Sequence, residues 1–357
     1  MQARCARAGG GGPGHRPTRV GSGSYGGWRA DPTVSIGAFL RRAAFALGYS
    51  LTFAAVSGFL LLRFGPYPDL RRAAAESILT SMHRGYAGLL VSADELARLR
   101  SSLYPVLGIH ATAPAMFARG ADHRVQLFTV RSSRYRGYVL LVHDPRSVAV
   151  GYSQRLPRAG ETTSSIARRL GAVAAINAGG FGDNAGAGTG GSPQGVIVHG
   201  GRFVFSELNA RHRKIPIVGF NRDGALVVGE MTRADIMKLG IREAISFGPP
   251  LVVNGKPVIT QGDGGWGIAP RTAIGQRRDG TVILLVVDGR QVDSIGATLR
   301  DVQEILLSYG AYVAANLDGG SSTTMYYHGR VINHPCDPMG ERMVPTVFFV
   351  RGDTGWQ

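Results

Sequence analysis

The pattern of apolar and polar positions changes at about residue 120. From there on, short apolar runs rich in β-branched residues alternate with glycine-containing turns, as in "GYVLLVHDP", "GVIVHGGRFVF" and "VILLVVDGR". Runs of this length between glycine, asparagine and aspartate are typical of strands and hairpins. Helical spacing predicts helices between the strands at residues 162–171, 232–239 and 298–309. We therefore predict one α+β domain over residues 120–357, with a mixed, mostly antiparallel β-sheet and a few flanking helices.

Three of the predicted hairpins share one layout, in which two apolar runs flank a short turn. Asn-Gly is the favoured pair for a two-residue turn, and histidine takes the place of asparagine in two of the three. We therefore predict that these histidines are turn residues and not catalytic groups. The three turns are His199-Gly200-Gly201, Asn254-Gly255-Lys256 and His328-Gly329-Arg330.

Residues 43–62 form a continuous apolar run without a charge, between Arg42 and Arg63. A run of this length spans a bilayer as a helix. A buried core helix and a cleaved signal peptide are the alternatives, but the run has no polar face and no small-residue cleavage site follows it. We predict an uncleaved signal-anchor over residues 36–66 that contacts the membrane through 43–62. The basic N-terminal tail favours a cytoplasmic N-terminus, which makes the protein a single-pass membrane protein with its large domain extracytoplasmic.

Two segments flank the apolar run and differ in composition from the domain. Residues 1–35 are rich in arginine and glycine without periodicity, which predicts a disordered tail. Residues 67–119 contain two helical patterns, one of which begins with Ser92 and Glu95 spaced as a capping box. We interpret this segment as a helical stalk or linker.

Charge and cysteine content narrow the class of function. The formal net charge is +16, and the mildly basic globular part of the chain suits anionic ligands such as phosphate esters. Nucleic-acid binding is not indicated, because no basic helix and no basic stripe interleaved with aromatic residues occurs. The two cysteines, Cys5 and Cys336, lie on opposite sides of the apolar run, so we expect no intramolecular disulfide.

The strongest chemical signal is the repetition of an acidic residue at the end of an apolar run. Asp288-Gly289 and Asp318-Gly319-Gly320 end two such runs, and the predicted helix 298–309 lies between them. A strand, helix, strand unit places both carboxylates at one edge of a sheet. Two carboxylates there can act as acid, base or nucleophile in glycosyl transfer to water.

Other strand ends add polar groups that could bind a ligand. The glycine-rich stretch 177–195 is followed by a strand pattern and not by a helix, so it does not predict a dinucleotide site. Its backbone amides after Asn177 could still approach a phosphate or a sugar closely. Arg271 and Arg290 lie at ends of predicted strands and carry the planar fork that suits phosphate, although a solvated arginine is the ordinary alternative for each.

Five motifs in order resemble the phosphodiester glycosidase family over about residues 120–353. One departure is Gly180, which stands where the family commonly has an aromatic residue. The motifs are "AAINAGGF", "FGPPLVVNGK", "APRTAIGQRRDGTVILLVVDGR", "SIGATLRDVQEILLSYGAYVAANLDGGSSTTM" and "GRVINHPCDPMGERMVPTVFFV".

The resemblance implies hydrolysis of a sugar-1-phosphodiester at its anomeric bond, with release of a phosphomonoester. It implies an N-acetylglucosamine-1-phosphodiester-like substrate, and the anchor favours an envelope glycopolymer or exopolysaccharide. By motif position, we take Asp318 as the first catalytic candidate, Asp288 as the second and Glu341 as the third. We expect the substrate to be bound by Arg271, Arg290, Arg342, Asn177, Gly179, Gly319, Gly320, Ser321 and Thr272.

Two other functions are kept open. A non-catalytic polysaccharide-binding or assembly protein of the envelope would use the same groove and bind without turnover. A metal-assisted phosphodiesterase needs a cluster of His and Asp ligands, and the histidines are scattered. We predict that no cofactor is required and assign no metal ligands, with Asp183 and Asp263 as the acidic turns that would suit a structural calcium ion.

Overall fold

The computed structural model describes residues 36–79, 84–102, 110–113, 124–182, 188–208 and 213–352. The predicted tail 1–35 and Asp183 lie outside the described residues. The chain divides into two compact units, Met1–Gly58 and Phe59–Gln357. We describe each by itself.

The apolar run forms one long helix, α1 (Ile36–Phe64). Within Phe39–Phe64, the most apolar stretch of 18 residues has a mean hydropathy of 1.8 and is 0% buried. Its length and composition suit a membrane span, and a signal sequence close to the N-terminus has the same properties.

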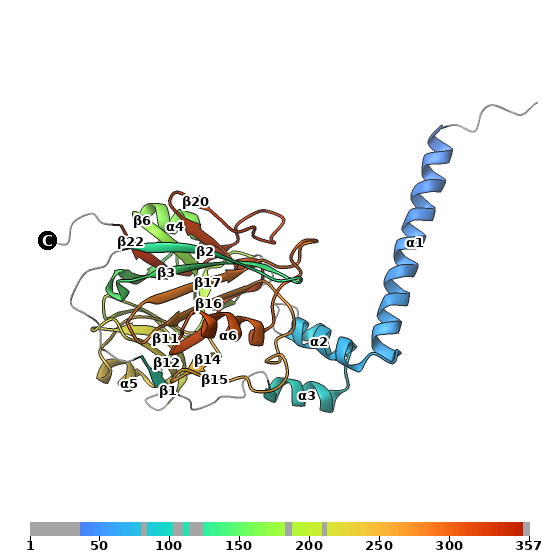
Figure 1. Ribbon diagram of the computed structural model, residues 1–357. Helices are drawn as coiled ribbons and strands as arrows, with labels where there is room; N and C mark the ends of the chain where they lie inside the picture. Colours follow the sequence, from blue (N-terminus) through green and yellow to red (C-terminus); the bar gives the residue numbers. More distant parts are fainter. Residues whose placement is uncertain are drawn as a thin grey trace, which may run out of the picture. The chain divides into compact units, whose positions relative to one another are not determined.

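Three sheets build the rest of the protein, and every pairing between their described strands is antiparallel (Figure 1). The 7-stranded sheet is ordered β15 (Lys256–Pro257), β14 (Pro250–Val253), β18 (Val313–Leu317), β16 (Arg271–Gln276), β17 (Val282–Val287), β3 (Arg136–Val142), β2 (Val125–Arg131). The 6-stranded sheet is ordered β1 (His110–Thr112), β12 (Leu226–Met231), β11 (Ile215–Asn221), β13 (Ile241–Ile245), β9 (Val196–His199), β10 (Arg202–Ser206). The 5-stranded sheet is ordered β20 (Arg330–Val331), β19 (Met325–Tyr327), β6 (Ala172–Asn177), β22 (Thr346–Arg351), β4 (Val148–Tyr152). Two short pairs complete the strands, β21 (Met343–Val344) with β5 (Glu161–Thr162) and β7 (Phe181–Gly182) with β8 (Ser192–Pro193).

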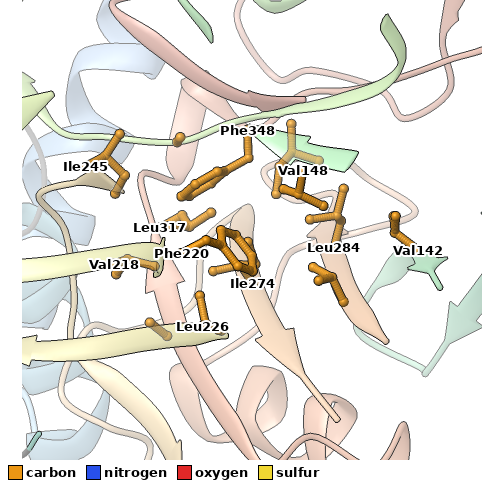
Figure 2. Packing of buried hydrophobic residues seen from close by; sticks show 14 of the residues in the cluster. Val142, Val148, Val218, Phe220, Leu226, Ile245, Ile274, Leu284, Leu317 and Phe348 are labelled. Atoms are coloured by element: carbon orange, nitrogen blue, oxygen red, sulfur yellow. The ribbon is translucent and has the colours of Figure 1, made fainter. Parts of the chain in front are cut away.

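One central core is shared by the three sheets. Strand side chains alternate between faces, so central strands such as β17 send every second residue, Val282, Leu284 and Val286, into this core. Figure 2 shows Leu284, Phe220 and Phe348, one from each sheet, meeting there. The rings of Phe220 and Phe348 pack edge to face with centroids 6.0 Å apart. The apolar runs read from the sequence therefore close a single hydrophobic interior.

Each predicted helix of the domain forms and covers the outer face of one sheet. The helix α4 (Thr163–Arg169) packs on the 5-stranded sheet, α5 (Arg233–Lys238) on the 6-stranded sheet and α6 (Leu299–Ser308) on the 7-stranded sheet. Capping boxes begin α5 and α6 and satisfy amides that the first helical turn leaves unpaired. Two short helices, η2 (Pro145–Ser147) and η4 (Gly320–Ser322), also lie in the described part of the domain.

The segment predicted as a stalk contains α2 (Pro68–Leu79), η1 (Arg84–Leu89) and α3 (Ala93–Ser102). Ala75 and Leu79 of α2 are buried in the same cluster as Leu251 and Trp266 of the domain. The strand β1 from the end of this segment pairs with β12. Residues before 120 thus contribute to the packing and to the sheet of the unit Phe59–Gln357.

Two of the three predicted turn residues, Asn254 and His328, lie in hairpin turns, and the third does not. Asn254 and His328 have positive φ angles of 54° and 44°, as two-residue turns of this kind require. The prediction for His199 was wrong, because His199 is the last residue of β9 and pairs with Arg202. Gly200 and Gly201, both at positive φ, make that turn. With two glycines available, the turn takes the pair that bears no Cβ.

Candidate active site

Two parallel strand ends and one strand start meet at a single edge of the 7-stranded sheet. Both β17 and β18 pair antiparallel with β16, so they run in the same direction on either side of it. Asp288 and Asp318 directly follow these strands, and Arg271 begins β16 opposite them. The prediction that both carboxylates lie at one edge is confirmed.

The side chain of Asn177 joins the end of β6 to this edge. Its Oδ1 accepts hydrogen bonds from Thr272 Oγ1 at 2.8 Å and from the amide of Thr324 at 3.1 Å. Its Nδ2 donates to the carbonyl oxygen of Asp318, and the amide of Asp318 donates to the carbonyl of Ala178 at 3.0 Å. Asn177 is completely buried. It therefore joins Thr272 to the backbone of Asp318.

The glycines after Asp318 allow the chain to lie against the start of β16. A Cβ on Gly319 would be 2.8 Å from the carbonyl oxygen of Pro270, and the amide of Gly320 donates to that oxygen at 2.9 Å. Gly320 has a φ of +60°, which residues with a side chain rarely adopt. A Cβ there would be 3.6 Å from Nη2 of Arg290. The guanidinium of Arg290 thus lies beside the loop that carries Asp318.

Arg290 has an unusual backbone for its residue type. Its φ of +58° is in the left-handed region, and its amide donates to the carbonyl of Ile295 at 3.1 Å. Non-glycine residues in that region are held there by their surroundings and concentrate at functional sites. The side chain is exposed, so its charge can reach a ligand in solvent. Ser321, at the same loop, is half-buried in η4.

Asp288 is buried and held by three donors. Its Oδ1 accepts from Nδ2 of Asn333 and from the amide of His334, each at 3.0 Å, and its Oδ2 is 3.5 Å from Nε of Arg136. The side chain is 0% exposed. A carboxylate in this setting fixes the loop at 333–334 against the end of β17. Both oxygens of Asp288 are thus engaged by groups of the protein.

Glu341 and Arg342 lie in the loop that leads into β21. The two carboxylate oxygens of Glu341 accept from the amide and the hydroxyl of Ser164, at 2.9 and 2.5 Å, in the first turn of α4. The guanidinium of Arg342 lies over the ring of Phe181, 4.8 Å from its centroid. This pair is therefore placed around α4 and β7, just beyond the end of β6.

Arg271 is turned into the protein. It is 3% exposed, and it donates to the carbonyl oxygens of Trp266, Gly267 and Ala297. Burial lowers the pKa of Arg271 to about 10. Its hydrogen bonds shape the loop before β16, so we do not place it against a substrate.

Two of the proposed backbone donors are already used within the protein. The amide of Gly179 donates to Oγ1 of Thr346 at 2.9 Å, and that of Gly320 donates to Pro270. Beside them, the ring of Phe247 would be 3.0 Å from a Cβ on Gly180. An aromatic ring thus reaches position 180 from another part of the chain.

Sequence reasoning missed Asn333, which holds the carboxylate of Asp288. Asn333 donates to Asp288 and to the carbonyl of Thr323, and its Oδ1 accepts from the amide of Met325. Asn333 stands in the motif "GRVINHP", but it is 45 residues from Asp288 along the chain. Such a contact has no local signal in a single sequence.

Within the described residues, no group of three or more His, Cys, Asp or Glu side chains gathers as a metal site would require. Oδ1 of Asp263 accepts from the amide of Gly265 at 2.8 Å in its own turn.

The sequence is similar to proteins of known name. The chain is 34% identical over 211 residues to an uncharacterized protein of the SPbeta prophage of Bacillus subtilis, covering 57% of this chain and 31% of that protein. It is 31% identical over 166 residues to N-acetylglucosamine-1-phosphodiester alpha-N-acetylglucosaminidase of Bos taurus, covering 42% of this chain and 31% of that protein. The chain therefore spans about a third of the length of these curated relatives.

A solved structure resembles the fold as well. The catalytic domain of the zebrafish N-acetylglucosamine-1-phosphodiester alpha-N-acetylglucosaminidase, auto-inhibited by its pro-peptide, superposes with a TM-score of 0.56 at 26% identity. The match covers 68% of this chain and 88% of that one. Residues 170–351, which contain Asn177, Asp288, Asp318 and Glu341, match the phosphodiester glycosidase family. The chain belongs to the phosphodiester glycosidase family.

Proposed function

We propose that this protein hydrolyses the bond between the anomeric carbon of a sugar and the phosphate of a sugar-1-phosphodiester. The observation that carries the proposal is the edge at which β6, β17 and β18 end. There Asn177 holds the backbone of the half-buried Asp318, and the exposed side chain of Arg290 lies beside Gly320 in the same loop. The curated relative that cleaves an N-acetylglucosamine-1-phosphodiester supports an N-acetylglucosamine-like sugar.

The proposed reaction divides the work between one carboxylate and one guanidinium. Water attacks the anomeric carbon, its oxygen bonds to that carbon, and the bond from the carbon to the phosphate oxygen breaks. The leaving phosphomonoester has a second pKa of about 6, so it departs without full protonation. Asp318 accepts the proton of the attacking water or stabilises positive charge at the sugar ring. Arg290 and the amide of Gly319 bind the phosphate.

The remaining polar groups have supporting or peripheral roles. Asn177, Thr272 and Asp288 hold the backbone of the edge in place. Ser321 is the hydroxyl nearest in sequence to Asp318 and is proposed to contact the sugar. Glu341 and Arg342, around Phe181, are proposed to contact the part of the substrate that lies beyond the end of β6. No cofactor takes part in the proposed reaction.

We also propose that the substrate belongs to the cell envelope or to exopolysaccharide. The apolar helix α1 would anchor the chain in a membrane, with the unit Phe59–Gln357 on the extracytoplasmic side. A phosphodiester-linked glycopolymer at that surface is an anionic substrate, which suits a chain with a net charge of +16.

The test is hydrolysis of an α-N-acetylglucosamine-1-phosphodiester in oxygen-18 water by the full chain in nanodiscs. We expect the label on the sugar, as cleavage at the anomeric carbon requires. Label on the phosphate would instead indicate attack at phosphorus and a metal phosphodiesterase. Binding without turnover would favour the polysaccharide-binding alternative.

A pair of matched variants assigns the carboxylate. Asp318→Asn keeps the size and the backbone contacts of the residue, so we expect a folded protein with turnover reduced by roughly a thousandfold. Asp223→Asn is the control, because Asp223 is exposed in the turn between β11 and β12. Equal activity of both variants would remove Asp318 from the mechanism.

A further inference from the structure

Two tight turns at the active-site edge carry unusually exposed apolar side chains. Val292 is fully exposed and Met339 is 91% exposed, the highest values for large apolar residues in the described part of the chain. The turn with Val292 is closed by hydrogen bonds between Gln291 and Ser294, and that with Met339 by a bond from the amide of Gly340 to Asp337. Turn tips are ordinarily polar or glycine. Here two turns at one edge carry apolar side chains at their tips. We infer that these side chains contact an apolar environment.

Both turns are fastened to the active site. Nε2 of Gln291 donates to the carbonyl of His334 at 2.6 Å, which joins the first turn to the loop that holds the second. The amide of His334 donates to Asp288. Arg290, the residue before the first turn, lies beside Gly320.

Further exposed apolar residues lie on the loops and the short strand around the same edge. Ile268 is close to the start of β16, Ile295 follows the turn at 291–294, and Met343 begins β21. Single exposed apolar residues are ordinary, whereas several on adjoining loops mark an interaction surface. We call these five residues the rim: Ile268, Val292, Ile295, Met339 and Met343.

The same edge is also linked to the end of the apolar helix. A Cβ on Gly267, in the loop that Arg271 holds, would meet Oγ of Ser77 in α2. The helix α2 begins at Pro68, four residues after the last residue of α1, and Nη1 of Arg71 donates to the carbonyl of Arg63 at 3.1 Å. At 1.5 Å per residue, α2 is about 18 Å long. Within the unit Phe59–Gln357, α2 thus contacts the loop next to the site.

We propose that the rim is a membrane-binding surface and that the substrate is a lipid-borne sugar phosphodiester. This rests on the proposed function. The sugar phosphate head of such a lipid would reach Asp318 and Arg290 while its tail stays in the bilayer. Val292 and Met339 would enter the boundary between headgroups and acyl chains, where their burial is favourable. The positive charge of the chain, with Arg290 exposed at the edge, complements anionic headgroups.

Membrane contact is tested without reference to activity. The full chain is placed in nanodiscs with anionic and brominated lipids, and quenching of a tryptophan at Val292→Trp or Met339→Trp is measured above the wild-type signal. Met237→Trp is the matched control, because Met237 is 68% exposed on α5, at the other end of the domain from α2 (Figure 1). We expect strong quenching at 292 and 339 and none at 237. Quenching at 292 and 339 no greater than at 237 would overturn the proposal.

The lipid character of the substrate is tested with two diesters that share one sugar phosphate head. One carries a long-chain alcohol embedded in the nanodisc, and the other carries methanol. We expect the double variant Val292→Ser with Met339→Ser to lower kcat/KM roughly a hundredfold on the lipid diester, since burial of each such side chain contributes about a tenfold factor or more. The rate on the methyl diester should not change, and Met237→Ser should affect neither.

The outcomes separate this inference from the proposed function. A double variant that slows both diesters equally, or a wild type without preference for the lipid diester, would overturn the lipid-borne substrate. Quenching at 292 and 339 without cleavage of either diester would remove the proposed function and keep the membrane-binding rim. Cleavage of the methyl diester without quenching would keep the proposed function and remove the membrane-binding rim.

Discussion

Replacing Asp288 by asparagine distinguishes a positioning carboxylate from a catalytic one. Asp288→Asn keeps the shape of the side chain and an oxygen for Asn333 and His334. It places an amide nitrogen opposite Nε of Arg136, so two donors face each other where the carboxylate now lies 3.5 Å from the guanidinium. We therefore expect a loss of stability as the main effect, with activity reduced far less than in Asp318→Asn.

The magnitude follows from burial and charge. Hydrogen bonds to a charged group contribute roughly 1.5–3 kcal/mol each, and the two that remain become weaker neutral bonds. Arg136 is 28% exposed and can turn partly to water, which limits the loss. We expect about 2–3 kcal/mol, which corresponds to a fall in Tm of roughly 4–10 °C for a domain of this size. Circular dichroism measures the Tm, and kcat/KM on the methyl diester measures the activity.

The same arginine supplies the control. Nη1 of Arg136 also contacts Asp293 at 3.1 Å, and that carboxylate is 64% exposed. An exposed ion pair contributes at most about 1 kcal/mol, so Asp293→Asn should shift the Tm by no more than about 3 °C. If Asp288→Asn kept the wild-type Tm and lost activity as fully as Asp318→Asn, Asp288 would be a catalytic residue and the positioning role would be refuted.

Three further changes probe the glycine loop and two ionisable groups. Gly320→Ala places a side chain at a φ of +60° and towards Arg290. We expect the free energy of unfolding to fall by about 1–2 kcal/mol and the KM for the diester to rise. An unchanged KM would show that Arg290 does not bind the phosphate. The hydrogen bond to Glu243 raises the pKa of His199, so the stability it contributes is present below pH 6.5 and is lost as the pH rises through the folded pKa. The Tm difference between wild type and His199→Gln should therefore shrink with rising pH, and a constant difference would contradict this. Burial raises the pKa of Glu76, so Glu76→Gln should raise the Tm at neutral pH, and this gain should vanish below pH 4.5. A lower Tm of the variant at neutral pH would show that the ionised form of Glu76 stabilises the protein.

The parts of the fold that the sequence predicts are those with local causes. The helix at 298–309 begins with a capping box in which Thr298 and Asp301 bond reciprocally. A capping box involves only four consecutive residues, so it can be recognised in a sequence. The strand runs were recognisable because both faces of a central strand are apolar, as in Val282–Val287. The common edge of Asp288 and Asp318 followed from the order strand, helix, strand.

The roles at the site depend on contacts that the sequence does not display. Arg271 follows a proline and begins a strand, as a ligand-binding arginine could, yet its side chain turns inward to three carbonyl groups. Asp288 and Asp318 directly follow their strands in the same way. They differ because Asn333 and Arg136 contact the carboxylate of Asp288. Strand order places a residue at an edge, whereas long-range packing determines which way its side chain points.

The site also depends on chain outside the range that matches the family. Residues 170–351 include both carboxylates, but β3 precedes that range and forms the full ladder with β17 that ends at Asp288. The amide of Asp288 donates to the carbonyl of Arg136 at 2.9 Å, and the side chain of Arg136 reaches the carboxylate. Without β3, the strand that presents Asp288 would be the edge of its sheet, with unpaired backbone groups where six residue pairs now join it to β3. The strand β3 thus supports the strand that presents Asp288, and α2 packs against the nearby loop at Gly267. Both kinds of support come from residues that carry no chemistry in the proposed reaction.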